Sequence, residues 1–215
     1  MKYTKIPETT FKNLQLNAGV LLSDFDPEDA TVANENIIGA TTGGVNFTAV
    51  PAFSDYGEDI DNCPKNMLEL KKLDSWDINM SGTFVTVDTE SGRSLVGAAD
   101  VSGNKITPRN DVLKSDFVDL WWVGDYSDEN GETDGGFVAI HMMNALSTGG
   151  FAIQSNDNGK GNFAFTYTAH YSMDAQETVP FEVYVKAGGT ATAHYSMDAQ
   201  ETVPFEVHVK AGGTA

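Results

Sequence analysis

Cysteine and basic residues are scarce in this sequence. The single cysteine, Cys63, excludes a disulfide within the chain and a cysteine-rich metal cage. Only 13 Lys and Arg face 31 Asp and Glu, which gives a net charge of −18. This balance argues against a domain that grips DNA or an anionic membrane by its phosphates. It favours a surface to which DNA does not adhere.

Long apolar runs are also missing. The first 16 residues contain no apolar stretch that could serve as a signal peptide. No segment approaches the roughly 20 consecutive apolar residues of a membrane span. We therefore expect a protein that folds in the cytosol and has no membrane partner.

The short motifs that mark many enzymes do not occur. We find no H-E-x-x-H, no paired-cysteine zinc spacing, no G-x-S-x-G and no glycine-rich nucleotide-binding pattern. The four histidines, His141, His170, His194 and His208, are interpreted as surface residues. We expect no enzyme, no catalytic residue, no metal site and no cofactor.

Two acidic stretches are the best candidates for a cation site. In residues 125–136, placing Gly131 at the required glycine puts Tyr126 where the helical calcium loop needs Asp. Residues 55–62 offer the carboxylates of Asp55, Glu58, Asp59 and Asp61. For both stretches a solvated loop is the favoured interpretation.

Residues 116–187 are predicted to form a ladder of antiparallel strands joined by short polar turns. From Phe163 to Tyr171, four aromatic residues and an alanine occupy every second position, which is typical of a half-buried strand. The adjacent Trp121 and Trp122 must point to opposite faces of their strand. One belongs to the core, and the other is either core or an exposed anchor for a protein or a sugar.

Upstream, residues 42–53 and 76–87 are predicted to pair as a hairpin. The loop between them, 55–72, is long, and loops of that length are usually functional or mobile. A helix is expected at about 89–99, because Asp88 offers an N-cap before an acidic first turn. Its apolar side should cover the sheet, and residues 102–116 should form a linker.

The N-terminal residues 1–25 are predicted to form an extended arm. Apolar residues alternate with polar ones from Leu14 to Leu22, until the turn-forming DFDPED ends the pattern. An amphipathic strand this near a terminus either joins the sheet or reaches a neighbouring subunit. The candidate contact residues of this arm are Leu14, Leu16, Val20 and Leu22.

The C-terminus holds a near-identical tandem repeat. Residues 192–215 copy residues 168–191, and only Tyr184 against His208 differs. We assign the first copy to the fold, because FAFTY extends its TAHY into a strand, and the second copy to an appendage. The appendage is either a weakly held tail or a strand that pairs with a sheet edge or competes with the first copy for one position. Its candidate pairing residues are Phe205, Val207 and Val209.

Four segments follow one another in a distinctive order, namely IIGATTGGVNF, YGEDIDNCPKNMLELKKLDSWDINMSGTF, SLVGAAD and VDLWWVGDYSDENG. With the final strands, this order resembles the major tail proteins (tail tube proteins) of long-tailed bacteriophages. The resemblance covers nearly all of residues 10–190. It implies a mainly β domain in residues 1–191, an antiparallel β-sandwich or small barrel with one flanking α-helix, a long hairpin loop and terminal arms. Residues 192–215 depart from the family pattern.

The resemblance also implies a structural role in a virion. Subunits would form hexameric rings in the host cytoplasm, and the rings would stack into a tail tube that conducts genome DNA during ejection. Partners would be a tape measure protein inside and terminator and distal tail proteins at the ends, with DNA held only in transit. Adjacent rings would be joined by the arm and by the long loop, through Asp55, Tyr56, Glu58, Asp59, Asp61, Asn62 and Lys65.

Two alternatives stay open. The inner tube of a contractile tail or tail-like particle would share the same fold. A carbohydrate-binding β-sandwich module would instead require a row of exposed aromatic side chains and a metal-filled acidic loop.

Overall fold

A computed structural model describes residues 14–15, 17–125 and 136–186. About half of the chain is strand, the sheets are antiparallel, and the described residues contain one α-helix. The expected mainly β class is therefore confirmed. Within the same residues, no helix has the length and apolar character needed to cross a bilayer.

The strands fall into one large sheet and one small hairpin. The large sheet has the order β2-β1-β7-β8-β10-β4-β3, with β11 beside β8 and β9 beside β10, and β5 pairs with β6 separately. The strand bounds are Val20–Leu22 (β1), Ile37–Gly39 (β2), Thr41–Asp55 (β3), Lys71–Phe84 (β4), Ala99–Ser102 (β5), Lys105–Pro108 (β6), Val118–Asp125 (β7), Phe137–Ser147 (β8), Ala152–Gln154 (β9), Asn162–Ala169 (β10) and Phe181–Lys186 (β11). The α-helix is α2, Thr89–Val96, and short 3-10 turns occupy Asn34–Asn36, Leu68–Leu70 and Lys114–Asp116.

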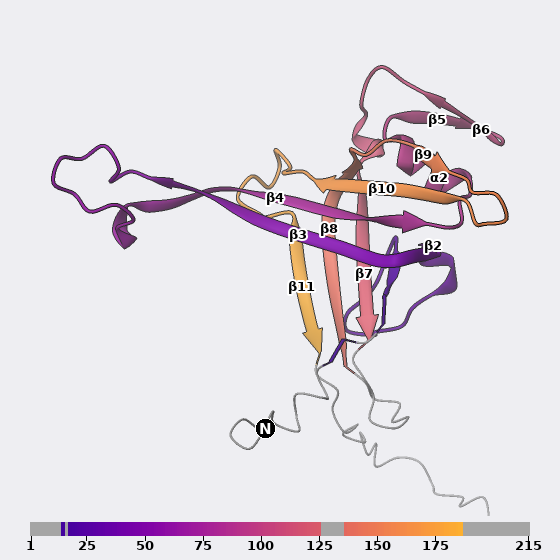
Figure 1. The fold of residues 1–215 in the computed structure, drawn as a ribbon, viewed down its shortest axis with the longest axis horizontal. Coiled ribbons are helices and arrows are strands. Elements are labelled where there is room, and N and C mark those ends of the chain that lie inside the picture. Colours follow the sequence, from indigo (N-terminus) through magenta and orange to yellow (C-terminus); the bar gives the residue numbers. More distant parts are fainter. Residues whose placement is uncertain (1–13, 16, 126–135, 187–215) are drawn as a thin grey trace, which may run out of the picture.

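Strand β8 belongs to two layers. Its first half, Phe137 to Met142, pairs with β11, whereas Ala145 to Ser147 pair with β10. The change of partner falls at Asn144, which has a left-handed φ of 49°. As a result, β7, β8 and β11 form one layer, and β3, β4 and β10 cross it at a steep angle (Figure 1). Such crossing layers bury the side chains between their inner faces.

The main core lies between these layers. The predicted alternation of β10 places Phe165 and Tyr167 there, both fully buried. Phe165 pairs with Gly82 of β4, and a Cβ on that glycine would stand 2.7 Å from the Phe165 ring. Gly82 is thus needed for close approach rather than for flexibility. The other buried members are Leu21, Ile78, Met80, Phe84, Leu95, Leu120, Met142 and Ala145.

A second cluster covers the opposite face of the β1-β7-β8 layer. It contains Leu22, Phe25, Trp121, Val123, Phe137 and Ala139. Because both faces of β1 are covered, Leu21 and Leu22 are buried together. This corrects the assignment of Leu22 to the arm contacts, since its side chain is already enclosed within the subunit.

The two adjacent tryptophans point to opposite faces, and neither is an exposed anchor. Trp121 is buried and stacks on His141 with ring centroids 4.0 Å apart. Trp122 packs against the main core, and its indole Nε1 donates to the carbonyl of Ala18 at 3.1 Å. His141 is accordingly half-buried rather than a surface residue.

Helix α2 begins where the sequence predicts. The Asp88 side chain accepts from the Ser91 N–H at 2.7 Å, and the Ser91 hydroxyl accepts from the Asp88 N–H. The helix ends at Val96, three residues before the predicted end, because Gly97 turns to a φ of 86°. Ala99 then starts the β5–β6 hairpin, so the expected linker 102–116 contains part of a hairpin that its short, polar strands did not reveal.

A buried carboxylate ties this hairpin to the body. The Asp116 side chain is fully buried and accepts from Arg109 Nη2 at 2.6 and 2.8 Å. The Leu113 N–H donates to the same carboxylate at 2.8 Å. Burial alone raises the pKa of Asp116, yet the hydrogen bonds from Leu113 and Arg109 and the nearby charges outweigh it and hold that pKa below its usual value.

We predict that Asp116→Asn lowers the free energy of unfolding at neutral pH by about 2–3 kcal/mol, because it removes the charge that compensates Arg109. Because its pKa is lower in the folded state, ionised Asp116 stabilises the fold above the pKa of about 3.9 that it has in the unfolded chain. This stabilisation is lost as the pH falls through the folded-state pKa. The difference from the parent should therefore shrink below about pH 4. Urea unfolding across this range measures it, with Asp111→Asn, on an exposed side chain, as the matched control.

We also predict that Leu95→Ala lowers the free energy of unfolding by about 2–5 kcal/mol, because it opens a cavity under α2. Leu68→Ala should change it by no more than about 0.5 kcal/mol, because that side chain is 86% exposed. Urea unfolding of monomeric protein compares the two. Equal losses would contradict the placement of α2 on the core.

Candidate assembly surface

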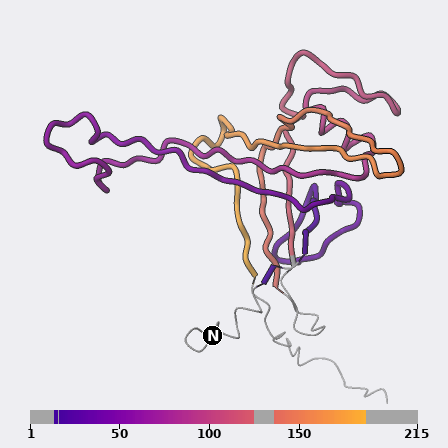
Figure 2. Tube along the Cα trace, viewed as in Figure 1, coloured from indigo at the N-terminus to yellow at the C-terminus, as the bar shows by residue number. Residues whose placement is uncertain are grey.

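The feature that stands apart from the body is the β3–β4 hairpin. Its two strands pair from Val45 opposite Gly82 to Asp55 opposite Lys71. Near the body, β4 also pairs with β10, but only from Asn79 to Phe84. Beyond that point the hairpin is a two-stranded ribbon that projects to one side of the molecule (Figures 1 and 2). We call Val50–Asp77 the distal hairpin.

Few contacts within the subunit stabilise a two-stranded ribbon of this kind. An isolated two-stranded hairpin is marginally stable in water, because it lacks a third strand or a packed layer. The distal hairpin nevertheless carries large apolar side chains in solvent. Phe53 and Leu73 are cross-strand partners, and both are about half exposed. The exposed set is Val50, Phe53, Tyr56, Ile60, Leu68 and Leu73.

The end of the distal hairpin is organised by Asp55. Its Oδ1 accepts from the Gly57 N–H at 3.0 Å and its Oδ2 from the Asn66 N–H at 2.8 Å. These bonds favour the carboxylate, so the hydrogen bonds from Gly57 and Asn66 hold the pKa of Asp55 below its usual value. Asn62 and Asn66 supply the two left-handed turn positions.

The structure separates the predicted loop residues by role. Asp55 shapes the loop, and Glu58 and Lys65 form an exposed ion pair at 3.2 Å. The remaining four are exposed and available to a partner, namely Tyr56, Asp59, Asp61 and Asn62. Sequence reasoning missed the apolar residues Phe53, Ile60 and Leu68. The signal was present, since apolar residues continue along the hairpin past the length that the core can cover.

The predicted terminal contacts are only partly described. Leu14 is exposed and Val20 lies at the border of exposure, which leaves both accessible. Leu16 lies outside the described residues, as do Phe205, Val207 and Val209 of the second repeat. Residues 126–135 of the acidic loop are outside them too. In the part of the chain that is described, no three His, Cys, Asp or Glu side chains are placed to hold a metal ion.

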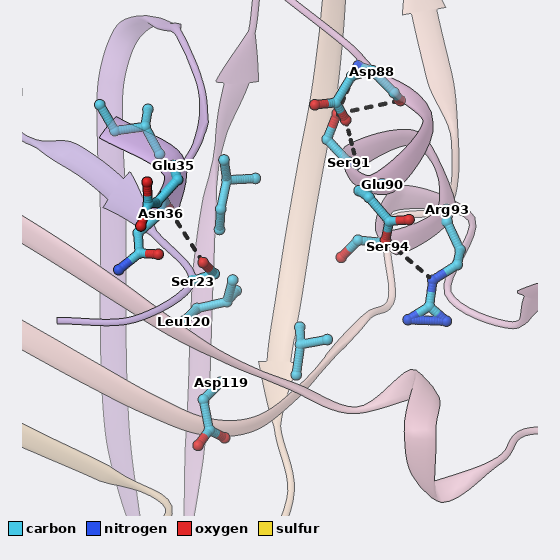
Figure 3. A pocket seen from close by; sticks show the side chains of 13 residues that line it. Ser23, Glu35, Asn36, Asp88, Glu90, Ser91, Arg93, Ser94, Asp119 and Leu120 are labelled. Atoms are coloured by element: carbon cyan, nitrogen blue, oxygen red, sulfur yellow. Dashed lines mark hydrogen bonds and ion pairs between the residues drawn. The ribbon is translucent and has the colours of Figure 1, made fainter. Parts of the chain in front are cut away.

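A cavity of about 380 Å³ lies between the start of α2 and the segment 35–38 (Figure 3). Several of its polar side chains form hydrogen bonds or ion pairs within the protein. Asp88 is bonded to Ser91, Arg93 lies 4.0 Å from Glu90 and 3.8 Å from Asp116, and Asp119 accepts from a backbone N–H of β8.

Neither a scan against protein-family models nor a search of curated proteins found a significant match. The class is therefore defined by the structure alone. It is a mainly antiparallel β protein of crossing layers, with one helix among its described residues and a projecting apolar hairpin.

We predict that Asp55→Ala loosens the end of the distal hairpin without unfolding the body. Losing the acceptor for two N–H groups should raise the amide exchange rates of Gly57 and Asn66 by roughly fivefold, the factor that one hydrogen bond contributes. Hydrogen exchange followed by NMR measures this. Asp61→Ala, on an exposed neighbour, should leave both amides unchanged.

Proposed function

We propose that this chain is the tube-forming subunit of a bacteriophage tail. It is a structural virion protein that assembles with copies of itself into hexameric rings, and the rings stack into a conduit for genome DNA. The observation that carries the proposal is the distal hairpin, whose exposed apolar side chains gain burial only from another molecule. The segment order that resembles tail tube proteins supports the same function.

The sheet edges support ring formation. Among the described strands, β3 and β2 end the path of the large sheet, and β11 pairs on one side only. Open edges of this kind invite pairing with other chains, and a closed ring satisfies them without open-ended growth. β3 runs for 15 residues and offers a neighbour a long row of backbone groups, interrupted at Pro51, which has no N–H.

The charge suits a conduit rather than a DNA-binding protein. A net charge of −18 repels phosphates, so DNA would pass an acidic wall without lasting contacts. At physiological ionic strength the repulsion acts over about 8 Å, close to the wall. In this account, the tape measure protein fills the tube before ejection, and terminator and distal tail proteins close its ends.

An inner tube of a contractile tail or tail-like particle would use the same surfaces, and a sheath gene beside this one would indicate it. The carbohydrate-binding module is less well supported. Trp121 and Trp122 lie inside the subunit and supply no exposed platform for a sugar.

We expect the purified protein at high concentration to form rings or tubes visible by negative-stain electron microscopy. Phe53→Asp and Leu68→Asp should abolish them without lowering the thermal midpoint of the monomer, because they place charges on the distal hairpin alone. Val112→Asp, on a side chain 54% exposed in the loop before β7, is the control and should assemble normally. Persistent monomers of the parent protein under all conditions would contradict the proposal.

A further inference from the structure

The contacts of β11 define what a strand must carry to lie beside β8. Phe181 stands opposite Met142, and the pairing continues in register to Lys186 opposite Phe137. The Phe181 ring lies 5.8 Å from Phe47 and 5.5 Å from Trp76, measured between centroids. Just before the strand, the carbonyl of Pro180 accepts from the Met143 N–H at 3.0 Å. These contacts come from one proline, one aromatic side chain and the backbone of a single strand.

The second repeat carries all of these features. Residues 204–210 read PFEVHVK, against PFEVYVK in residues 180–186. The one substitution falls at Tyr184, whose ring lies 5.6 Å from Trp121 and whose hydroxyl donates to Glu182. His208 at this position would keep a flat ring on Trp121 but lose the hydroxyl, so the second copy fits the same place slightly less well.

We propose that residues 205–210 can occupy the position of β11 beside β8, in the same register, and displace residues 181–186. The sheet then has one position for which two strands of the same chain compete. Whichever copy is displaced, each subunit keeps one spare strand of nearly the same sequence. This inference does not depend on the proposed function.

Chain connectivity decides which copy is favoured. The first copy reaches the position from the end of β10 through residues 170–180, and the second copy through residues 170–204, a connection about three times as long. Closing the longer connection costs entropy that scales with the logarithm of its length, which favours the first copy by roughly sixfold. Tyr184 adds to this preference. The first copy is therefore the main occupant, and the second is a populated alternative.

The test compares three variants of the full chain by urea unfolding. Phe205→Asp should leave the folding equilibrium unchanged, because the second copy is the minor occupant. Phe181→Asp should lower the equilibrium constant by no more than about tenfold, since the second copy takes its place. The double variant should lose on the order of a hundredfold, the effect of removing a packed aromatic side chain. In this double-mutant cycle, the loss of folding free energy in the double variant should clearly exceed the sum of the losses in the two single variants. Losses for Phe181→Asp that equal those of the double variant would overturn the proposal.

A second measurement works in a chain with both copies intact. With Cys63→Ser, the pair Ile140→Cys and Val207→Cys should form a disulfide within one chain under reversible oxidation. Ile140→Cys with Val183→Cys is the matched control, because these two residues are partners in the register. Mass analysis distinguishes the outcomes. A Val207→Cys disulfide that forms only between two chains, or not at all while the control pair closes, would refute exchange within the subunit.

Discussion

The fold depends on a single strand that changes partner halfway along. β8 pairs with β7 along one side from Phe137 to Ala145, while the partner on its other side changes from β11 to β10 at Asn144. The positive φ at that residue leaves its N–H and carbonyl without their ladder partners. The N–H donates to Asp119 Oδ1 at 2.9 Å and the carbonyl accepts from the His170 N–H at 3.2 Å, so neither group is lost. This satisfied irregularity allows one sheet to fold into two layers with a core between them.

The same geometry explains why the hairpin projects. β4 needs only its last six residues, Asn79 to Phe84, to pair with β10 and close the core. Ile78 still reaches the core and Trp76 still packs against Phe181, but past Trp76 most of the large apolar side chains of the hairpin are exposed. A ribbon that is marginal alone, yet carries apolar side chains and a loop ordered by Asp55, would gain stability by burying those side chains on a second molecule. This exposure is the reason that we propose assembly as the function.

Local sequence signals predicted the elements well and their partners less well. The alternation around Phe165 and the cap at Asp88 correctly indicated β10 and the start of α2. The burial of Leu22 did not follow from the alternation. An amphipathic strand exposes one face to solvent, but here Phe25 covers that face. The partner change at Asn144 gave no signal, since it depends on β10 and β11 meeting β8 from distant parts of the chain. The apolar residues of the distal hairpin were visible in the sequence, but their exposure follows only from knowing where the core ends.

The central claim is that the distal hairpin is a contact surface between copies of this chain. A cryo-electron microscopy reconstruction of the assembled protein tests it most directly, because it shows what lies against Phe53, Leu68 and Leu73. We expect these side chains to be buried on an adjacent subunit, with the hairpin crossing from one ring to the next. An assembly in which the hairpin extends into solvent, with its apolar side chains still exposed, would contradict it.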